Sequence, residues 1–179
     1  MNKSKKHIIN IAFTAVFAAL TAVITSQLKL YTGINEGYIH FGDGIIYLAA
    51  CSLPLPYAAA AAAVGGAAAD ILAGAAVWAV PTAVIKALTT LPFSMVFALK
   101  LTKKPQKMLN KTTAFMPLAS GAVTVLGYLA AESIMYSFQT AVLSVPGSFV
   151  QAAASAAVYY AAAAALDKMN FKTRIYKSL

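Results

Sequence analysis

The sequence predicts an all-α integral membrane protein, a six-transmembrane-helix bundle with a ligand pocket near its external face. Of the 179 residues, 60% are hydrophobic and only 11% are charged, whereas a soluble domain carries about 25% charged residues. The mean hydropathy is +0.73. The basic residues gather at the ends of the apolar segments, which is typical of membrane topology. We therefore expect a single membrane domain over residues 1–179, with cytoplasmic basic tails at 1–7 and 167–179.

Apolar runs define the expected spans, because a helix needs about 20 predominantly apolar residues to cross a bilayer. Five spans are expected near 8–28, 57–77, 80–101, 114–135 and 146–166. A sixth, near 42–54, is shorter and follows a glycine-rich stretch. The first run is longer than the apolar core of a signal peptide and has no convincing cleavage site, so we expect it to be retained.

The distribution of lysine and arginine independently supports six spans. Basic clusters precede the first span (3–6), separate the fourth from the fifth (100–111) and follow the last (168–177). Six spans put all three clusters, with twelve of the 14 basic residues, on the side that the positive-inside rule makes cytoplasmic. Five spans would put them on opposite sides. Both termini of this cell-membrane protein are then expected in the cytoplasm.

The stretch Gly37–Gly44 holds the densest cluster of groups able to hydrogen-bond a ligand. It combines Tyr38, His40 and Asp43 with three glycines, directly before the short apolar run, and Glu36 precedes it. A short, glycine-interrupted segment points to the binding site in a transporter-like sequence, because irregular backbone at membrane depth must line protein or a cavity. The alternative is a tight external loop that leads into an ordinary short helix.

The expected topology gathers most of the carboxylates toward the external face, together with several aromatic and amide side chains. Ionisable residues inside a membrane are costly and are usually functional or paired. The predicted substrate-binding residues are Glu36, Tyr38, His40, Asp43, Trp78, Glu132, Tyr136 and Gln151. Interfacial anchoring is the alternative for Glu132, Tyr136 and Gln151, and it suits tyrosine particularly well.

Two further charges are expected to pair with each other. Asp70 lies on one helix face with Gly66 and Gly74, four residues away on either side. Lys86 lies about as far beyond the intervening turn as Asp70 lies before it, so the two residues share a depth on neighbouring helices. Because buried charges are usually paired, we expect an Asp70–Lys86 ion pair with a structural role. A role for either residue in ligand binding is the alternative.

The first span carries small residues four apart, Ala15 with Ala19 and Ala18 with Ala22. Residues at this spacing share a face and let another helix approach closely. Packing within the bundle and docking of a separate membrane subunit both explain the pattern.

Some function classes have no support in the sequence. There is no P-loop, and no serine–histidine–aspartate order or His-Glu-x-x-His motif indicates a hydrolase. A lone Cys51 and only two histidines give no zinc pattern. The net charge of +9 follows membrane topology rather than a nucleic-acid groove. We therefore predict no enzyme activity, no metal, no cofactor and no nucleic-acid partner.

From residue 8 to residue 166 the chain resembles the substrate-binding (S) component of energy-coupling factor (ECF) vitamin transporters. The features that carry the resemblance are the alanine-rich first span, Phe41–Leu48, Gly66–Gly74 followed by Pro81–Lys86, Gly127-Tyr128 with Glu132, and Val145-Pro146 with Gln151. The resemblance implies a six-helix bundle that captures one water-soluble vitamin or precursor at the external face. It also implies a transmembrane coupling subunit and two ATPase subunits as partners.

Within that family the first-helix alanines contact the coupling subunit, so the resemblance implies docking through Ala15 and Ala19 or through Ala18 and Ala22. The chain looks most like members that handle pyrimidine or pyridine compounds, such as hydroxymethylpyrimidine, thiamine or pyridoxine. One alternative function is a stand-alone facilitative or proton-coupled carrier that uses Asp70, Glu132 and His40 as a relay. An intramembrane enzyme that acts on lipid head groups is another alternative, which the lack of a paired-acid motif disfavours.

Overall fold

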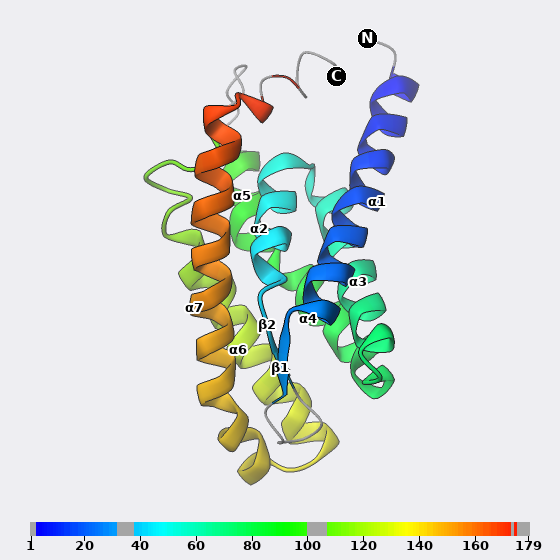
Figure 1. Cartoon of the computed structure of the whole chain (residues 1–179), viewed down its shortest axis with the longest axis vertical. Coiled ribbons are helices and arrows are strands. Elements are labelled where there is room, and N and C mark those ends of the chain that lie inside the picture. Colours follow the sequence, from blue (N-terminus) through cyan, green and yellow to red (C-terminus); the bar gives the residue numbers. More distant parts are fainter. Residues whose placement is uncertain (1–2, 32–37, 100–106, 173, 175–179) are drawn as a thin grey trace.

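The computed structural model describes residues 3–31, 38–99, 107–172 and 174. Figure 1 shows a helical bundle in which α1 (Lys3–Gln27), α3 (Leu55–Leu72) and α7 (Phe138–Lys168) stand around the short α2 (Asp43–Ser52), and α6 (Met116–Met135) packs along α7. The 3₁₀ turn η1 (Ala76–Trp78), α4 (Ala79–Thr89) and α5 (Leu91–Leu99) complete it. The helix α1 begins and α7 ends at one end of the bundle, which we call the termini end. A small hairpin marks the other, the hairpin end.

The outer surface of the bundle is apolar. Within the described residues, five helical segments are long and apolar enough to cross a membrane, and only 17–39% of each is buried inside the chain. Large apolar side chains such as Leu118 (73% exposed) and Ile134 (87% exposed) point outward. A soluble protein rarely exposes so much contiguous apolar surface. The prediction of a helical membrane bundle is confirmed.

The short helix α2 is the centre of the bundle. Each of its ten residues is buried, and at 1.5 Å per residue it is about 15 Å long, half of the apolar thickness of a bilayer. It packs against α1, α3, α4, α5 and α7. Gly44 lets α7 approach, because a Cβ there would lie 2.8 Å from the Ser155 carbonyl oxygen. Since protein rather than lipid surrounds it, the predicted short segment needs no full bilayer length.

An aromatic core fills the termini end. The Tyr47 and Phe93 rings stack with centroids 5.0 Å apart, and Tyr159 meets Phe93 edge-on at the same distance. All three side chains are fully buried, as is Met108. Asp167 on α7 accepts hydrogen bonds from the backbone N–H groups of residues 108 and 109, at 2.8 and 2.9 Å. The described residues at this end are therefore tightly packed around a buried aromatic core.

The two alanine pairs of α1 face different surroundings. Ala18 and Ala22 are buried, whereas Ala15 and Ala19 are exposed. Helix α3 packs against the buried pair, and a Cβ on Gly65 would lie 2.7 Å from the Ala18 carbonyl oxygen. The structure thus separates the alternatives: Ala18 and Ala22 pack inside the chain, and Ala15 and Ala19 are left on the surface.

The structure adds a hairpin that the sequence did not predict. Strands β1 (Lys29–Tyr31) and β2 (Tyr38–His40) pair antiparallel, with Leu30 opposite Ile39. Each strand has only three residues, too few for an alternating pattern to stand out in a sequence.

Two of the predicted spans have different boundaries in the structure. The span expected to begin at residue 146 is wrong at its start, because α7 begins at Phe138 and contains Pro146. Ser137 caps this start by accepting a hydrogen bond from the Thr140 backbone N–H at 3.3 Å. The span expected near 80–101 is interrupted at Thr90, between α4 and α5. Pro92 follows this break, and its ring nitrogen has no hydrogen to donate.

Candidate solute-binding site

A cavity opens at the hairpin end of the bundle. Its volume is about 540 Å³, including its open mouth. Strand β2, helices α3, α4, α6 and α7, and the turn η1 all contribute to its wall. The lining residues are Tyr38, Ile39, His40, Asp70, Trp78, Thr82, Tyr128, Glu132, Ser144, Gly147, Ser148 and Gln151.

The hairpin fixes His40 in one protonation state. The Gly42 backbone N–H donates to His40 Nδ1 at 3.1 Å, so the ring accepts at Nδ1 and is a neutral imidazole with its proton on Nε2. Burial, reinforced by the Lys86 ammonium, lowers the pKa of His40 from 6.5 to about 3. The His40 backbone N–H donates to Gln151 Oε1 at 3.4 Å, which ties β2 to α7. His40 is therefore a hydrogen-bond donor through Nε2–H.

A buried ion pair contacts two of the lining residues, Gln151 and Tyr128. Lys86 Nζ lies 2.7 Å from Asp43 Oδ1, and the two side chains are 1% and 0% exposed. Gln151 Nε2 donates to Asp43 Oδ2 at 3.3 Å and Thr124 Oγ1 donates to it at 3.4 Å. The Lys86 ammonium also stands 4.9 Å from the ring centroid of Tyr128. The first residue of α2 is thus linked to α4, α6 and α7 by one polar network.

The predicted Asp70–Lys86 ion pair is wrong. Lys86 pairs with Asp43 instead, and Asp70 accepts a hydrogen bond from the Tyr38 hydroxyl at 2.5 Å. Helix α2 carries Asp43 into the middle of the bundle, where it meets the inward face of α4. The prediction compared the depths of the two residues along neighbouring helices, but depth does not specify which way each side chain points. Asp70 consequently lines the cavity rather than a structural seam.

Aromatic side chains form one side of the cavity. The Trp78 ring lies 6.0 Å from the Tyr128 ring, edge to face, and 6.0 Å from the Tyr136 ring. The Tyr128 and Thr82 hydroxyls share a hydrogen bond of 3.1 Å. Trp78 is itself only 5% exposed, so its ring is held firmly by its neighbours. Such a wall offers flat apolar faces with hydroxyl groups at their edges.

Most of the predicted substrate-binding residues come together here, although their role in binding stays a prediction. Tyr38, His40, Trp78, Glu132 and Gln151 line the cavity. Asp43 does not line it but forms the ion pair and contacts the lining residue Gln151, and Tyr136 lies against Trp78. Glu36 is outside the described residues.

The sequence analysis missed several lining residues. These are Ile39, Thr82, Tyr128, Ser144, Gly147 and Ser148, with Asp70 misassigned to a structural pair. Residues 144, 147, 148 and 151 follow the spacing of one helix face. That signal requires a helix that begins before residue 146. Tyr128 precedes Glu132 by four residues, and this spacing places the two on one face of α6.

Comparison with known protein families identifies a match over most of the chain. A family model described as "ECF-type riboflavin transporter, S component" matches residues 5–168. No curated protein matches the chain. The family description names riboflavin, not the pyrimidine or pyridine compounds that the resemblance suggested. Proteins of this kind are transport subunits and not enzymes, in agreement with the sequence-based expectation. The chain belongs to the family of S components of ECF-type transporters.

Proposed function

We propose that this S component captures a planar aromatic vitamin in the cavity at the hairpin end. The observation that carries the proposal is the meeting of the Tyr38, Trp78 and Tyr128 rings with polar groups in one cavity. Binding sites for small molecules combine mostly apolar walls with a few placed polar groups. Flat rings favour a flat ligand, and the Nε2–H of His40 and the Asp70 carboxylate offer hydrogen bonds at its edge.

Two groups of vitamins are candidates for the solute. Riboflavin is the first, because the matching family is named for it. Pyrimidine and pyridine compounds such as hydroxymethylpyrimidine, thiamine and pyridoxine are the second, on the resemblance described above. Both groups present a planar nitrogen heterocycle with hydrogen-bonding substituents. The cavity offers aromatic rings for the heterocycle and polar side chains for the substituents.

Transport requires partners that this chain does not contain, namely a coupling subunit and two ATPase subunits. We propose that the coupling subunit docks on the face of α1 that carries Ala15 and Ala19. Both are exposed, and small residues allow a partner helix to approach closely. Ala18 and Ala22 are already occupied by packing inside the chain. A stand-alone carrier remains the alternative, and uptake in vesicles that lack the ATPase subunits would favour it.

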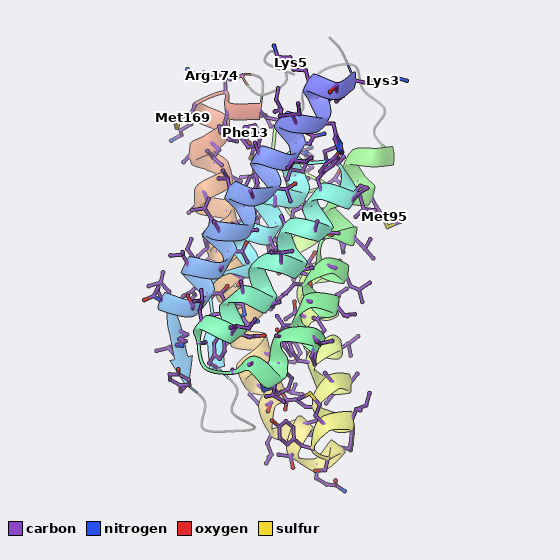
Figure 2. All side chains as sticks on the ribbon, turned by 90° about the vertical axis from the view of Figure 1, so that its right-hand side faces the viewer. Lys3, Lys5, Phe13, Met95, Met169 and Arg174 are labelled. Atoms are coloured by element: carbon purple, nitrogen blue, oxygen red, sulfur yellow. The ribbon has the colours of Figure 1, made fainter. Side chains whose placement is uncertain are left out.

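The hairpin end is proposed to face the outside of the cell. Lys3, Lys5 and Arg174 lie together at the termini end (Figure 2). Under the positive-inside rule that end is cytoplasmic. This orientation leaves the cavity open to external solute, as capture of a vitamin requires.

The proposed function is tested by thermal stabilisation of the purified protein with riboflavin, thiamine, hydroxymethylpyrimidine and pyridoxine. A bound solute at 100 times its dissociation constant should stabilise the folded state by about 2.7 kcal/mol. Trp78→Ala should remove this stabilisation, because the ring forms part of the cavity wall. Phe149→Ala is the matched control, since Phe149 is 62% exposed and lies outside the lining. Failure of every compound, or equal stabilisation of the Trp78→Ala variant, would refute the proposal.

A further inference from the structure

The Asp70 carboxyl group is buried in the wall of the cavity, and only 4% of the residue is exposed. The Tyr38 hydroxyl donates to its Oδ1 at 2.5 Å. The Thr82 hydroxyl also hydrogen-bonds to the same carboxyl group. Within the described part of the chain, no lysine or arginine forms an ion pair with Asp70. Its partners are therefore neutral hydroxyl groups, and the carboxyl group can still accept a positively charged donor from outside the chain.

The cations near the cavity are engaged elsewhere. Lys86 attracts Asp70 but forms its ion pair with Asp43 at 2.7 Å. The Lys29 ammonium donates to the Ala73 carbonyl oxygen at 3.4 Å and stands over the rings of residues 31 and 38, at 5.0 and 5.5 Å. Among the described residues that line the cavity there is no lysine or arginine, while Glu132 adds a second carboxyl group. A buried charge is strongly unfavourable unless it is paired.

The aromatic side of the cavity is also suited to a cation. The face of an aromatic ring attracts positive charge within about 6 Å. Tyr128 already interacts in this way with the Lys86 ammonium, at 4.9 Å from its ring centroid. Trp78, whose ring is the strongest type of cation partner, lies beside Tyr128 and lines the same cavity. His40 is neutral and so does not oppose a positive ligand.

We propose, on the basis of the function proposed above, that the solute is a positively charged nitrogen heterocycle that places its charge against Asp70. Trp78 and Tyr128 cover the faces of the charged ring. Asp70 is then the residue that selects cationic over neutral solutes. Thiamine, with its permanently charged thiazolium ring, has the required chemistry, whereas riboflavin has a neutral ring system.

The test compares the affinities of the purified full-length protein for thiamine and for the neutral probes riboflavin and pyridoxine at pH 8. We expect thiamine to bind at least about tenfold more tightly than either neutral probe, since a hydrogen bond to a charged group contributes about ten- to a hundredfold. Asp70→Asn keeps the shape of the side chain and should abolish this preference. Asp167→Asn, which removes a carboxylate at the termini end, should retain it.

Tyr38→Phe is the second variant, to be used if Asp70→Asn does not fold. It retains the Asp70 carboxyl group and should therefore preserve the preference for thiamine. Neutral probes that bind the wild type as tightly as thiamine would overturn the inference, while the proposed function would stand. A preference for thiamine that Asp70→Asn leaves intact would also overturn it. If none of the three probes binds, the proposed function fails on these probes and the inference fails with it.

Discussion

Lys86→Met is expected to lower the free energy of unfolding by about 3–5 kcal/mol, which is exceptional for a single substitution. Methionine has a similar length and fills the space, but it leaves the Asp43 carboxylate without its cation. Asp43 is 0% exposed and begins the central helix α2, so the charge has no route to water. The loss should appear as a lower midpoint of thermal or denaturant unfolding in detergent micelles.

The double variant Asp43→Asn/Lys86→Met separates the effect of charge from the effect of side-chain volume. Removing both charges should restore much of the lost stability, because a buried ion pair contributes little beyond an uncharged pair of the same volume. Lys107→Met is the control, since Lys107 is an exposed lysine at the termini end. If Lys86→Met unfolds no more easily than this control, the ion pair does not hold α2 in place. A double variant no more stable than Lys86→Met would show that charge is not the reason for the loss.

Ala19→Trp is expected to abolish uptake and co-purification with the coupling subunit while it leaves solute affinity unchanged. Ala19 is exposed on α1 and lies about one turn from Ala15. An indole at this position projects from the surface and keeps a partner helix from close approach, but it disturbs no internal contact. Uptake in cells and pull-down of the coupling subunit measure the first effects, and the affinity of the purified variant measures the last.

Ala18→Trp is the matched comparison on the same helix. Ala18 is 9% exposed, and its carbonyl oxygen faces Gly65 across the contact with α3. A large side chain there must push the helices apart, so stability and solute binding should fall together. Loss of solute affinity in Ala19→Trp before loss of docking would assign that face to the core. Normal uptake by Ala19→Trp would place the docking surface elsewhere.

The sequence predicts the bundle well because apolar composition and span length depend directly on whether a segment lies in lipid or in water. A run of apolar residues must face lipid or core whatever its neighbours are. The short segment before residue 54 is the informative case. The segment is too short to cross the lipid, and the structure shows it enclosed by five other helices. The glycine-rich stretch before it then leads into the cavity, since Tyr38 and His40 line that cavity.

The rotation of helices is what sequence reasoning could not supply. Lys86 is equally compatible in depth with Asp70 and with Asp43, and only packing decides which carboxylate it meets. The same limit explains the missed face of α7. The last span was expected to begin at residue 146, so Ser144 was placed before it, although Ser144 and Gly147 both line the cavity from one continuous helix. The identity of the solute could not be predicted for a similar reason, because it depends on a few side chains that differ among members of one family.

The most direct test of the central claim uses Trp78, the only tryptophan in the chain. Its ring lines the cavity, so its fluorescence reports on that site alone. A vitamin that stabilises the protein thermally and does not absorb in the emission range should change Trp78 emission saturably. The dissociation constant should equal the one obtained from stabilisation. Stabilisation by a vitamin without any change in the intensity or wavelength of Trp78 emission would place the solute elsewhere and contradict the assignment of this cavity.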